Sequence, residues 1–305
     1  MTVTQPLTGS LATGLYWHAG EPGLALADPG SSERWLPLRP GATVGWRLAG
    51  PRRCTGVWLA DSRRRRFCPH RADVPQAGGA AQCAACAAAD PGRRLARDQT
   101  LDRRTFGVYL AWFGPELVKV GITAADRGID RLAEQGALAF TWLAHGPHPA
   151  ARAAEQAATA AGVPDRIGRK AKVAGWSQPA DPDMRREQLA VVHGRLAGTI
   201  NLSPPMQTLP CRVHDLCGRY GLTGTPLVPT TEVSAAGDGS VLAGTLTYLI
   251  GRNAIVHTAQ EALLADLRLL SGWTLTLHTG PARGLQLAPR HPAGSHHAAG
   301  QDTLF

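Results

Sequence analysis

The sequence predicts a mixed α/β protein of the α+β kind, in which a small central sheet with helices lies between β-rich flanks. Residues 11–50 alternate apolar and polar side chains around glycine and proline, as short strands joined by tight turns do. From residue 105 to about residue 202 the pattern runs strand, strand, helix, strand, helix, and residues 221–277 return to strand-like runs. The chain has 305 residues and is 44% apolar, so it is long enough to bury a sizeable core.

Changes in composition divide the chain into five segments. Residues 51–104 are Arg-rich, hold four of the six cysteines and have weak periodicity, which is typical of an inserted segment. The stretch "NLSPPMQTLP" is a plausible linker, and "AQEALLADLRLL" predicts a helix within the last β-rich run. The segments are an N-terminal β-rich segment (1–50), a basic insertion (51–104), an α/β core (105–202), a C-terminal β-rich domain (203–280) and a flexible tail (281–305).

The net charge of +9 is concentrated in the insertion. Residues 51–104 contain 12 arginines and five aspartates, which gives +7 for this segment alone. Such a basic belt favours a polyanionic partner, with nucleic acid ahead of a membrane surface. The alternative is the amino-acid bias of a GC-rich genome, because arginine, alanine, glycine and proline are all frequent.

The N-terminal residues show neither a basic start followed by an apolar stretch nor a cleavage-like end, and no apolar run is long enough to span a bilayer. We therefore expect a cytoplasmic protein without a membrane partner. In a reducing compartment, six cysteines are better explained as metal ligands or buried thiols than as disulfides.

The cysteines of the insertion have the spacing of a zinc site. Cys83 and Cys86 form a Cys-x-x-Cys knuckle, and Cys54 and Cys68 supply a second pair, with His70 as the competing ligand. Four cysteine ligands close a tetrahedral Zn²⁺ site and leave no position for water, so the predicted metal is structural and the insertion resembles a zinc ribbon. The alternatives are buried thiols beside a chance "CAAC" in an Ala-rich segment, or a redox role.

Two further cysteines, Cys211 and Cys217, flank His214 in "CRVHDLC". Their x5 spacing matches no metal knuckle, so ordinary buried cysteines are the preferred interpretation.

The stretch "GVYLAWFGPELVKVGIT" predicts a hairpin with two chemically different faces. With the loop at Gly114–Glu116, Tyr109 faces Gly121 across the strands, and Lys119 is a diagonal neighbour of Tyr109. One face is then apolar, while the other carries a phenol, an ammonium group and a bare glycine. Lys119 is notable because the chain has 29 arginines and only three lysines. The alternatives are a lysine that reaches solvent at a sheet edge and a tyrosine of the core.

Two helices follow the hairpin. The first, within "AADRGIDRLAEQGA", places Arg127 and Arg131 four residues apart on one stripe, with Asp126 as the predicted N-cap and Gly136 as the C-terminal stop. The second contains Glu155, three residues after Arg152, and a solvated ion pair between the two is the plain alternative to a functional role.

These residues carry a resemblance to known proteins. The order "GVY", "KVG", a helix with Arg131 and a later helix with Glu155 resembles the GIY-YIG nuclease superfamily over residues 105–165, in the branch where lysine replaces the second tyrosine. More narrowly, "VYLAWFGPELVKVGIT", "RLAEQGA", the upstream cysteines and "VLAGTLTYLIG" resemble an uncharacterised prokaryotic family, domain of unknown function 2797, over most of residues 50–277.

The superfamily resemblance implies a phosphodiesterase site. It implies that Tyr109 and Arg131 act at the scissile phosphate and that Glu155 holds a divalent cation, Mg²⁺ or Mn²⁺. Lys119 takes the place of the second tyrosine and Gly121 that of the motif glycine. Arg127 is the additional phosphate-binding candidate on the same helix as Arg131. This hypothesis requires that Tyr109, Lys119, Arg131 and Glu155 converge in one cleft.

The last residues, "QDTLF", resemble the short peptides by which bacterial replication and repair proteins bind the sliding clamp. Gln301, Leu304 and Phe305 would be the anchors at the end of a polar tail.

Taken together, the sequence predicts a nucleic-acid-binding protein with a GIY-YIG-like core, structural zinc and, in an enzymatic form, metal-dependent endonuclease activity on DNA or RNA. The alternative is a non-catalytic, zinc-stapled scaffold or protein-interaction module.

Overall fold

The structure is a computed structural model, and it describes residues 8–28, 33–59, 62, 64–96, 100, 102–176, 181–202, 204–222 and 229–290. The candidate clamp-binding residues Gln301, Leu304 and Phe305 lie outside the described residues. Strands and helices are both abundant, which confirms the predicted mixed α/β class. In the described part of the chain, no helix combines the length and the apolar character that a membrane span requires.

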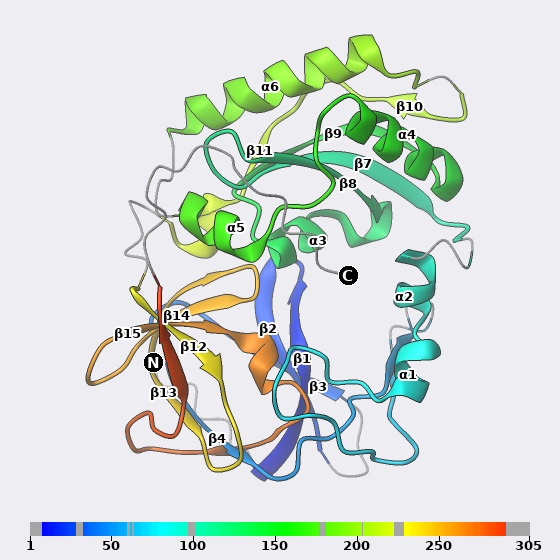
Figure 1. Cartoon of the computed structure of the whole chain (residues 1–305). Helices are drawn as coiled ribbons and strands as arrows, with labels where there is room; N and C mark the ends of the chain where they lie inside the picture. Colours follow the sequence, from blue (N-terminus) through cyan, green and yellow to red (C-terminus); the bar gives the residue numbers. More distant parts are fainter. Residues whose placement is uncertain are drawn as a thin grey trace.

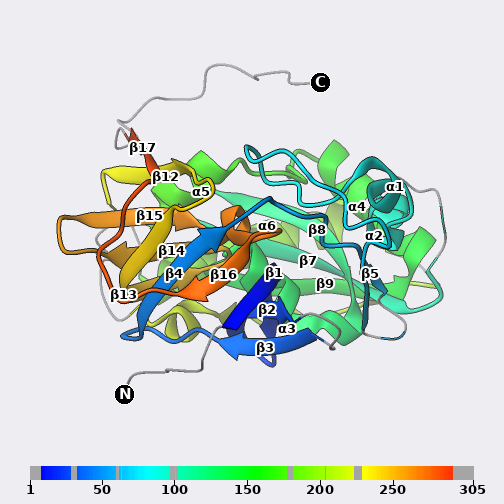
Figure 2. The same ribbon diagram turned by 90° about the horizontal axis from the view of Figure 1, so that it is seen from below.

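Strands from the two ends of the sequence form one sheet, which has ten strands in the described residues and the order β17-β12-β15-β14-β13-β4-β16-β1-β2-β3. Seen from below, the orange strand β16 lies between the blue strands β4 and β1 (Figure 2). The two β-rich blocks of the sequence therefore share one structural unit. The strands are β1 (Thr8–His18), β2 (Glu21–Ala27), β3 (Glu33–Pro37), β4 (Thr43–Ala49), β12 (Thr231–Ala235), β13 (Val241–Ile250), β14 (Asn253–His257), β15 (Ala262–Asp266), β16 (Thr274–Leu277) and β17 (Gln286–Pro289).

Strand β4 shows why these segments form a sheet. Val44, Trp46 and Leu48 are buried at alternating positions, whereas Arg47 points to solvent, as the period of a half-buried strand requires. Both neighbours of β4, the strands β13 and β16, come from the C-terminal part of the chain.

The helix predicted in "AQEALLADLRLL" is wrong, because this stretch forms β15 and a short 3₁₀ helix, η3 (Leu267–Leu270). β15 lies between β12 and β14 in the sheet, and Leu263, Leu264 and Ala265 are consecutive buried residues. A strand buried on both faces gives a continuous apolar run, which periodicity alone does not distinguish from a buried helix.

The central segment forms a second, smaller sheet with helices on both faces. In the described residues this sheet has the order β10-β9-β7-β8, and β11 also pairs with β9. Figure 1 shows α4 and α6 on one side of the sheet and α3 and α5 on the other. The elements are β7 (Thr105–Trp112), β8 (Val118–Ala124), η1 (Ala125–Arg127), α3 (Gly128–Gln135), β9 (Ala139–Pro147), α4 (His148–Ala160), α5 (Arg169–Trp176), α6 (Pro182–Thr199), β10 (Gln207–Thr208), β11 (His214–Asp215) and η2 (Cys217–Tyr220).

The predicted hairpin is present with the predicted register. Tyr109 pairs with Gly121, and Ala111 pairs with Lys119, so Tyr109, Lys119 and Gly121 leave β7 and β8 on the same face. The loop closes between Phe113 and Leu117, with a backbone hydrogen bond of 2.9 Å. On the opposite face, Val108, Leu110 and Val120 are fully buried.

Helix α3 joins the two sheets. The Asp130 carboxylate accepts hydrogen bonds from the backbone amides of Ala19 and Gly20, at 3.1 and 2.7 Å, in the turn between β1 and β2. The helix ends at Gly136 in a left-handed conformation, as predicted. The predicted N-cap is wrong: Asp126 lies in η1 and binds Arg104, and the capping position has no side-chain hydrogen bond.

The insertion forms a small unit of its own, with a two-stranded sheet and two short helices. Its separate apolar cluster contains Val57, Val74 and three of the cysteines. Five buried residues are too few for a stable core, so this unit needs an additional source of stability, such as a bound metal ion. The elements are β5 (Val57–Leu59), β6 (Arg64–Arg66), α1 (Ala84–Ala88) and α2 (Pro91–Ala96).

Candidate metal centre and cationic face

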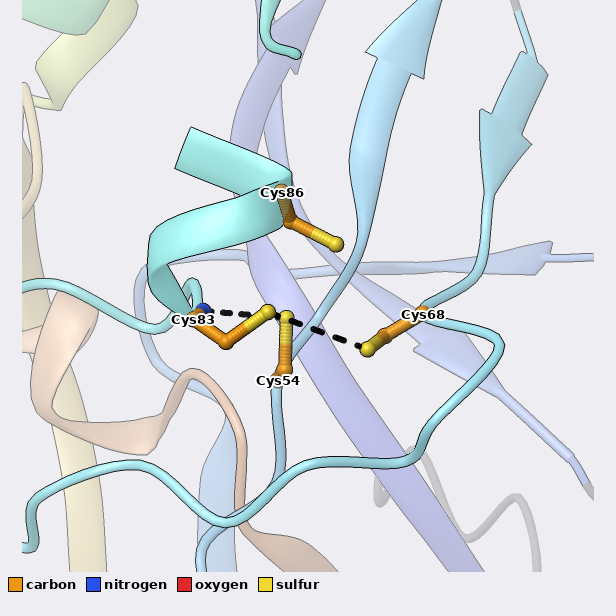
Figure 3. Close-up of side chains that lie close together, drawn as sticks. All are labelled: Cys54, Cys68, Cys83 and Cys86. Atoms are coloured by element: carbon orange, nitrogen blue, oxygen red, sulfur yellow. Dashed lines mark hydrogen bonds between the residues drawn. The ribbon is translucent and has the colours of Figure 1, made fainter. Parts of the chain in front are cut away.

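The four cysteines of the insertion converge on one point (Figure 3). Cys54 precedes β5, Cys68 follows β6, Cys83 is the N-cap of α1 and Cys86 lies in the first turns of that helix. We call these residues the cysteine cluster. Their sulfur atoms all lie within 4.8 Å of one another, and the Cys68 and Cys83 sulfurs are 3.9 Å apart.

This geometry fits a tetrahedral metal ion. Sulfurs bound at about 2.3 Å to one Zn²⁺ are separated by roughly 3.8 Å, close to the distance between the sulfurs of Cys68 and Cys83. Backbone amides of Cys83 and Gly56 point at the Cys54 sulfur, at 3.2 and 3.4 Å, and such amides stabilise a thiolate. The four cysteines could therefore hold a metal ion such as zinc.

The thiols of the cluster differ in their pKa values. The backbone amide of Ala72, helped by that of His70, lowers the pKa of the Cys68 thiol to about 7. Burial raises the pKa values of Cys54 and Cys86. Because a metal ion binds thiolates, its binding must displace the protons that burial retains on these two residues.

The alternative ligand His70 and the two remaining cysteines are not part of the cluster. His70 is exposed, and its side chain is not among the grouped ligand atoms of the described residues. Cys211 is exposed and Cys217 is buried beside the Leu138 carbonyl, where burial raises the pKa of Cys217 to about 12. Among the described residues these two cysteines belong to no metal-ligating group.

Some of the basic charge of the insertion is used inside the protein. Arg52 is 1% exposed and donates to the carbonyls of Ser271, Pro75 and Gly78. The side chain of Arg65 is 3% exposed and forms an ion pair with Glu33 at 2.6 Å. A count of arginines therefore overstates the charge that the insertion offers to a partner.

On the hairpin, Tyr109 and Lys119 are in contact. The Lys119 ammonium lies 5.5 Å from the centre of the Tyr109 ring and donates to the Asp165 carbonyl at 3.0 Å. The Tyr109 hydroxyl accepts from the Gln135 amide at 2.7 Å. Lys119 is 8% exposed and Tyr109 is 2% exposed. Lys119 therefore does not extend into solvent at the sheet edge.

Two glycines allow aromatic side chains to lie flat on this face of the sheet. A Cβ at Gly121 would be 2.4 Å from the Tyr109 hydroxyl oxygen, and a Cβ at Gly107 would be 2.4 Å from the Trp142 ring. Trp142 packs edge-on against Tyr109, with ring centres 6.2 Å apart. The space that the missing side chains of these two glycines leave is thus occupied by the Tyr109 and Trp142 rings.

Arg127, at the end of η1, and Arg131, in α3, are the two predicted arginines near this face. Both are partly exposed and share one carboxylate: Glu134 binds Arg127 at 2.7 Å and Arg131 at 3.4 Å. Helix α3 also supplies Gln135, whose side-chain amide holds the Tyr109 hydroxyl and which no motif in the sequence marks.

Two more cations complete the arrangement. Lys172 of α5 donates to the Gln135 carbonyl at 3.3 Å, and its ammonium lies 4.1 Å from the centre of the Phe113 ring. Lys172 is close enough to Lys119, Arg131 and Arg252 for their charges to lower its pKa, in addition to the larger effect of burial. Arg252 lies in the turn between β13 and β14. We call Lys119, Arg127, Arg131, Lys172 and Arg252 the cationic face.

Glu155 lies on the other side of the central sheet. Its helix, α4, packs through His148 on Phe106, which leaves β7 on the face opposite to Tyr109; the ring centres are 4.7 Å apart. Figure 1 shows the same separation of α4 from α3. The Glu155 carboxylate pairs with Arg152 at 2.5 Å. The structure thus groups Tyr109, Lys119 and Arg131, and it does not bring Glu155 to them.

The side of the sheet that carries α4 and α6 also has a groove of about 550 Å³. It runs between α6 and the edge of β8, and the side chains of Met184 and Val191 at its rim are 42% and 64% exposed.

Comparison with known proteins places the chain in a family. The model of the family described as "Protein of unknown function (DUF2797)" matches residues 75–275, about two thirds of the chain. No curated protein and no solved structure matches. The chain belongs to the DUF2797 family.

Proposed function

We propose that this protein binds nucleic acid through its phosphate groups at the cationic face, and that it does so without cleaving the strand. One observation carries the proposal. Within the described residues, the five cations form only two ion pairs. These join Arg127 and Arg131 to the same carboxylate, that of Glu134. Asp266 also acts on Arg252, but its carboxylate is paired with Arg268, so positive charge is in excess when the five cations are protonated. A polyanion is the kind of ligand that neutralises such an excess.

The resemblance to the GIY-YIG superfamily supports a phosphate ligand and gives less support to hydrolysis. Tyr109 and Lys119 are in contact on one face, and Arg131 is in the helix whose Gln135 binds the Tyr109 hydroxyl, an arrangement that suits a phosphate ligand. The predicted metal ligand Glu155 is paired with Arg152 on a helix that packs on the opposite face. A Mg²⁺ or Mn²⁺ ion held by Glu155 would lie away from the Tyr109 hydroxyl, so we expect binding and not endonuclease activity.

We further propose that the metal of the cysteine cluster is zinc and that its role is structural. Four sulfur ligands suit Zn²⁺ and close its coordination sphere. Zinc then holds the insertion against the ten-stranded sheet, where Arg65 binds Glu33.

The test is fluorescence anisotropy with labelled single-stranded and double-stranded oligonucleotides of DNA and RNA over a series of salt concentrations. For wild type we expect log affinity to fall linearly with log salt, with a slope of about 0.7 to 0.9 for each phosphate contact. The double variant Arg131→Gln/Arg252→Gln should bind more weakly and with a smaller slope. The matched control is Arg93→Gln/Arg94→Gln, because both arginines are exposed on α2 of the insertion.

Three outcomes would contradict the proposal. Affinity that does not depend on salt would favour the scaffold alternative. A control pair that weakens binding as much as the test pair would move the site to the insertion. Cleavage that requires Mg²⁺ or Mn²⁺ and disappears in Glu155→Ala would establish the endonuclease.

A further inference from the structure

The ammonium group of Lys172 lies near three other cations. Its ammonium is half-buried against the Phe113 ring and makes one hydrogen bond, to the Gln135 carbonyl. The charged groups that face it are Lys119 from β8, Arg131 from α3 and Arg252 from the turn between β13 and β14. All three are cations.

The described residues provide no carboxylate partner for this amine. Glu134, the acidic residue of the cationic face, is bound to Arg127 and Arg131. Asp165 offers its carbonyl to Lys119, and its carboxylate lies 3.8 Å from Arg166. A folded chain rarely places cations together in a half-buried site unless something compensates the repulsion.

The same atoms connect Lys172 to the hairpin. The Gln135 carbonyl accepts from Lys172, while the Gln135 side-chain amide donates to the Tyr109 hydroxyl. Lys119 lies over the Tyr109 ring. Lys119 thus contacts Tyr109 and Lys172 contacts Gln135, and they are two of the three lysines in the chain.

We propose that Lys172 is a phosphate-binding residue and that binding of a phosphate group of the nucleic acid is coupled to protonation of this amine. The phosphate group is the counterion that the cationic face lacks. The inference rests on the proposed function, because it names the residue at which the nucleic-acid phosphate is bound.

The coupling has a definite sign. In the free protein, burial and then the neighbouring cations lower the pKa of Lys172 from 10.5 to about 7. A bound phosphate favours the ammonium and raises the pKa again. Between about pH 7 and the raised value, the complex holds more protons than the free protein. Affinity should therefore be highest below pH 7 and fall as the pH rises through this window.

The experiment measures the affinity of the full chain for an oligothymidylate with a 5′-hydroxyl, at pH 6.5 and pH 8.5 and constant ionic strength. Internal phosphodiesters do not titrate in this range, whereas a phosphate monoester has a second pKa near 6. We expect wild-type affinity to fall about tenfold between the two pH values. Calorimetry at pH 8 in two buffers of different ionisation enthalpy should show uptake of about one proton.

Variants of two lysines on the same helix separate the possible results. Lys172→Arg keeps its charge at both pH values, so its affinity should not change with pH. Lys172→Gln should bind weakly at both. Lys170→Gln is the matched control, because Lys170 is exposed two residues before Lys172 in the same helix, and it should retain the wild-type profile. Circular dichroism and thermal melting establish that each variant is folded.

The outcomes distinguish this inference from the function on which it rests. If salt-dependent binding persists and both Lys172 variants keep the wild-type pH profile, the role of Lys172 is wrong and the proposed function stands. If no oligonucleotide binds wild type at any pH tested, both are wrong. A parallel series with a 5′-phosphorylated strand identifies the source of the phosphate: a pH-dependent gain that requires the 5′-phosphate and Lys172 assigns the site to a terminal group.

Discussion

The cysteine cluster and the cationic face are built in opposite ways. In the cysteine cluster, four identical side chains from one stretch of 33 residues approach to within 4.8 Å, in an arrangement that one metal ion satisfies. In the cationic face, five cations come from five different segments, and among the described residues only Arg127 and Arg131 form an ion pair, both with Glu134. The first site can be completed by an ion that stays in the protein. The second retains an excess of positive charge, which a transient anionic ligand can neutralise. On the proposed function, the first site would stabilise the fold and the second would bind a partner.

The largest effect that would sharpen this comparison is loss of the metal. We expect Cys86→Ser to abolish metal binding, because it removes one of the four ligands. The loss of stability should be large, since a structural zinc ion contributes on the order of 10 kcal/mol to the folding of small zinc units. The insertion should then be cleaved rapidly by proteases, while the two large sheets remain folded. Elemental analysis and limited proteolysis measure both effects. Acidification should have the same consequence, since protons compete with the metal for the thiolates.

Cys211→Ser is the control, because Cys211 is exposed and lies outside the cluster. Wild-type protein that contains no stoichiometric metal, and whose insertion resists proteolysis without it, would show that the comparison is mistaken.

The next effect concerns a cation that does have a partner. Arg65 lies in the insertion with its side chain 3% exposed, and its ion pair with Glu33 joins β6 to the ten-stranded sheet. We expect Arg65→Met to lower the free energy of unfolding by about 3 to 5 kcal/mol, because it leaves a largely buried carboxylate without its partner. Chemical denaturation measures this change.

The neighbouring residue provides the control. Arg64 is exposed in the same strand, so Arg64→Met should change stability by no more than about 0.5 kcal/mol. If the two variants lose equal stability, the distinction between internal and available cations fails. Oligonucleotide binding by Arg64→Met then shows whether any arginine of β6 contributes to the partner surface.

The smallest effect tests the backbone beneath Tyr109. Gly121→Ala would place a Cβ 2.4 Å from the Tyr109 hydroxyl, so the ring must shift away from Gln135. We expect a loss of about 1 to 3 kcal/mol, as in other overpacked sites, together with weaker oligonucleotide binding. Gly194→Ala in α6 is the control, since nothing lies within 4 Å of its new Cβ. That variant should be stabilised by up to about 1 kcal/mol. Equal stability of the two variants would mean that the Tyr109 ring does not pack tightly against Gly121.

Sequence reasoning recovered the parts whose signal is local. The alternation in residues 107–123 defined the hairpin, its loop and the common face of Tyr109 and Lys119. The Cys83-x-x-Cys86 knuckle and its second pair defined the cluster. In both cases the residues that meet are related by a fixed period or by a well-known ligand spacing.

The missing parts depend on how the chain crosses the sheet. After α4 the chain passes the edge of β8, where the Val120 amide donates to the Pro164 carbonyl, and only then reaches α5 and Lys172. Periodicity identifies α4 as a helix but does not say on which face it packs, so the position of Glu155 relative to Tyr109 could not be deduced. The scarcity of lysine in the chain applies to Lys172 as much as to Lys119, and it is a signal in the sequence that points to Lys172.

The shared sheet has a consequence for biosynthesis. Trp46 of β4 pairs with Leu242 of β13 and with Leu277 of β16. These partners leave the ribosome roughly 200 residues after β4, and pairings over such distances form slowly. Until then β4 has two unpaired edges, which can associate with other nascent chains. Expression at low temperature or with a chaperone should therefore improve the yield of correctly assembled protein.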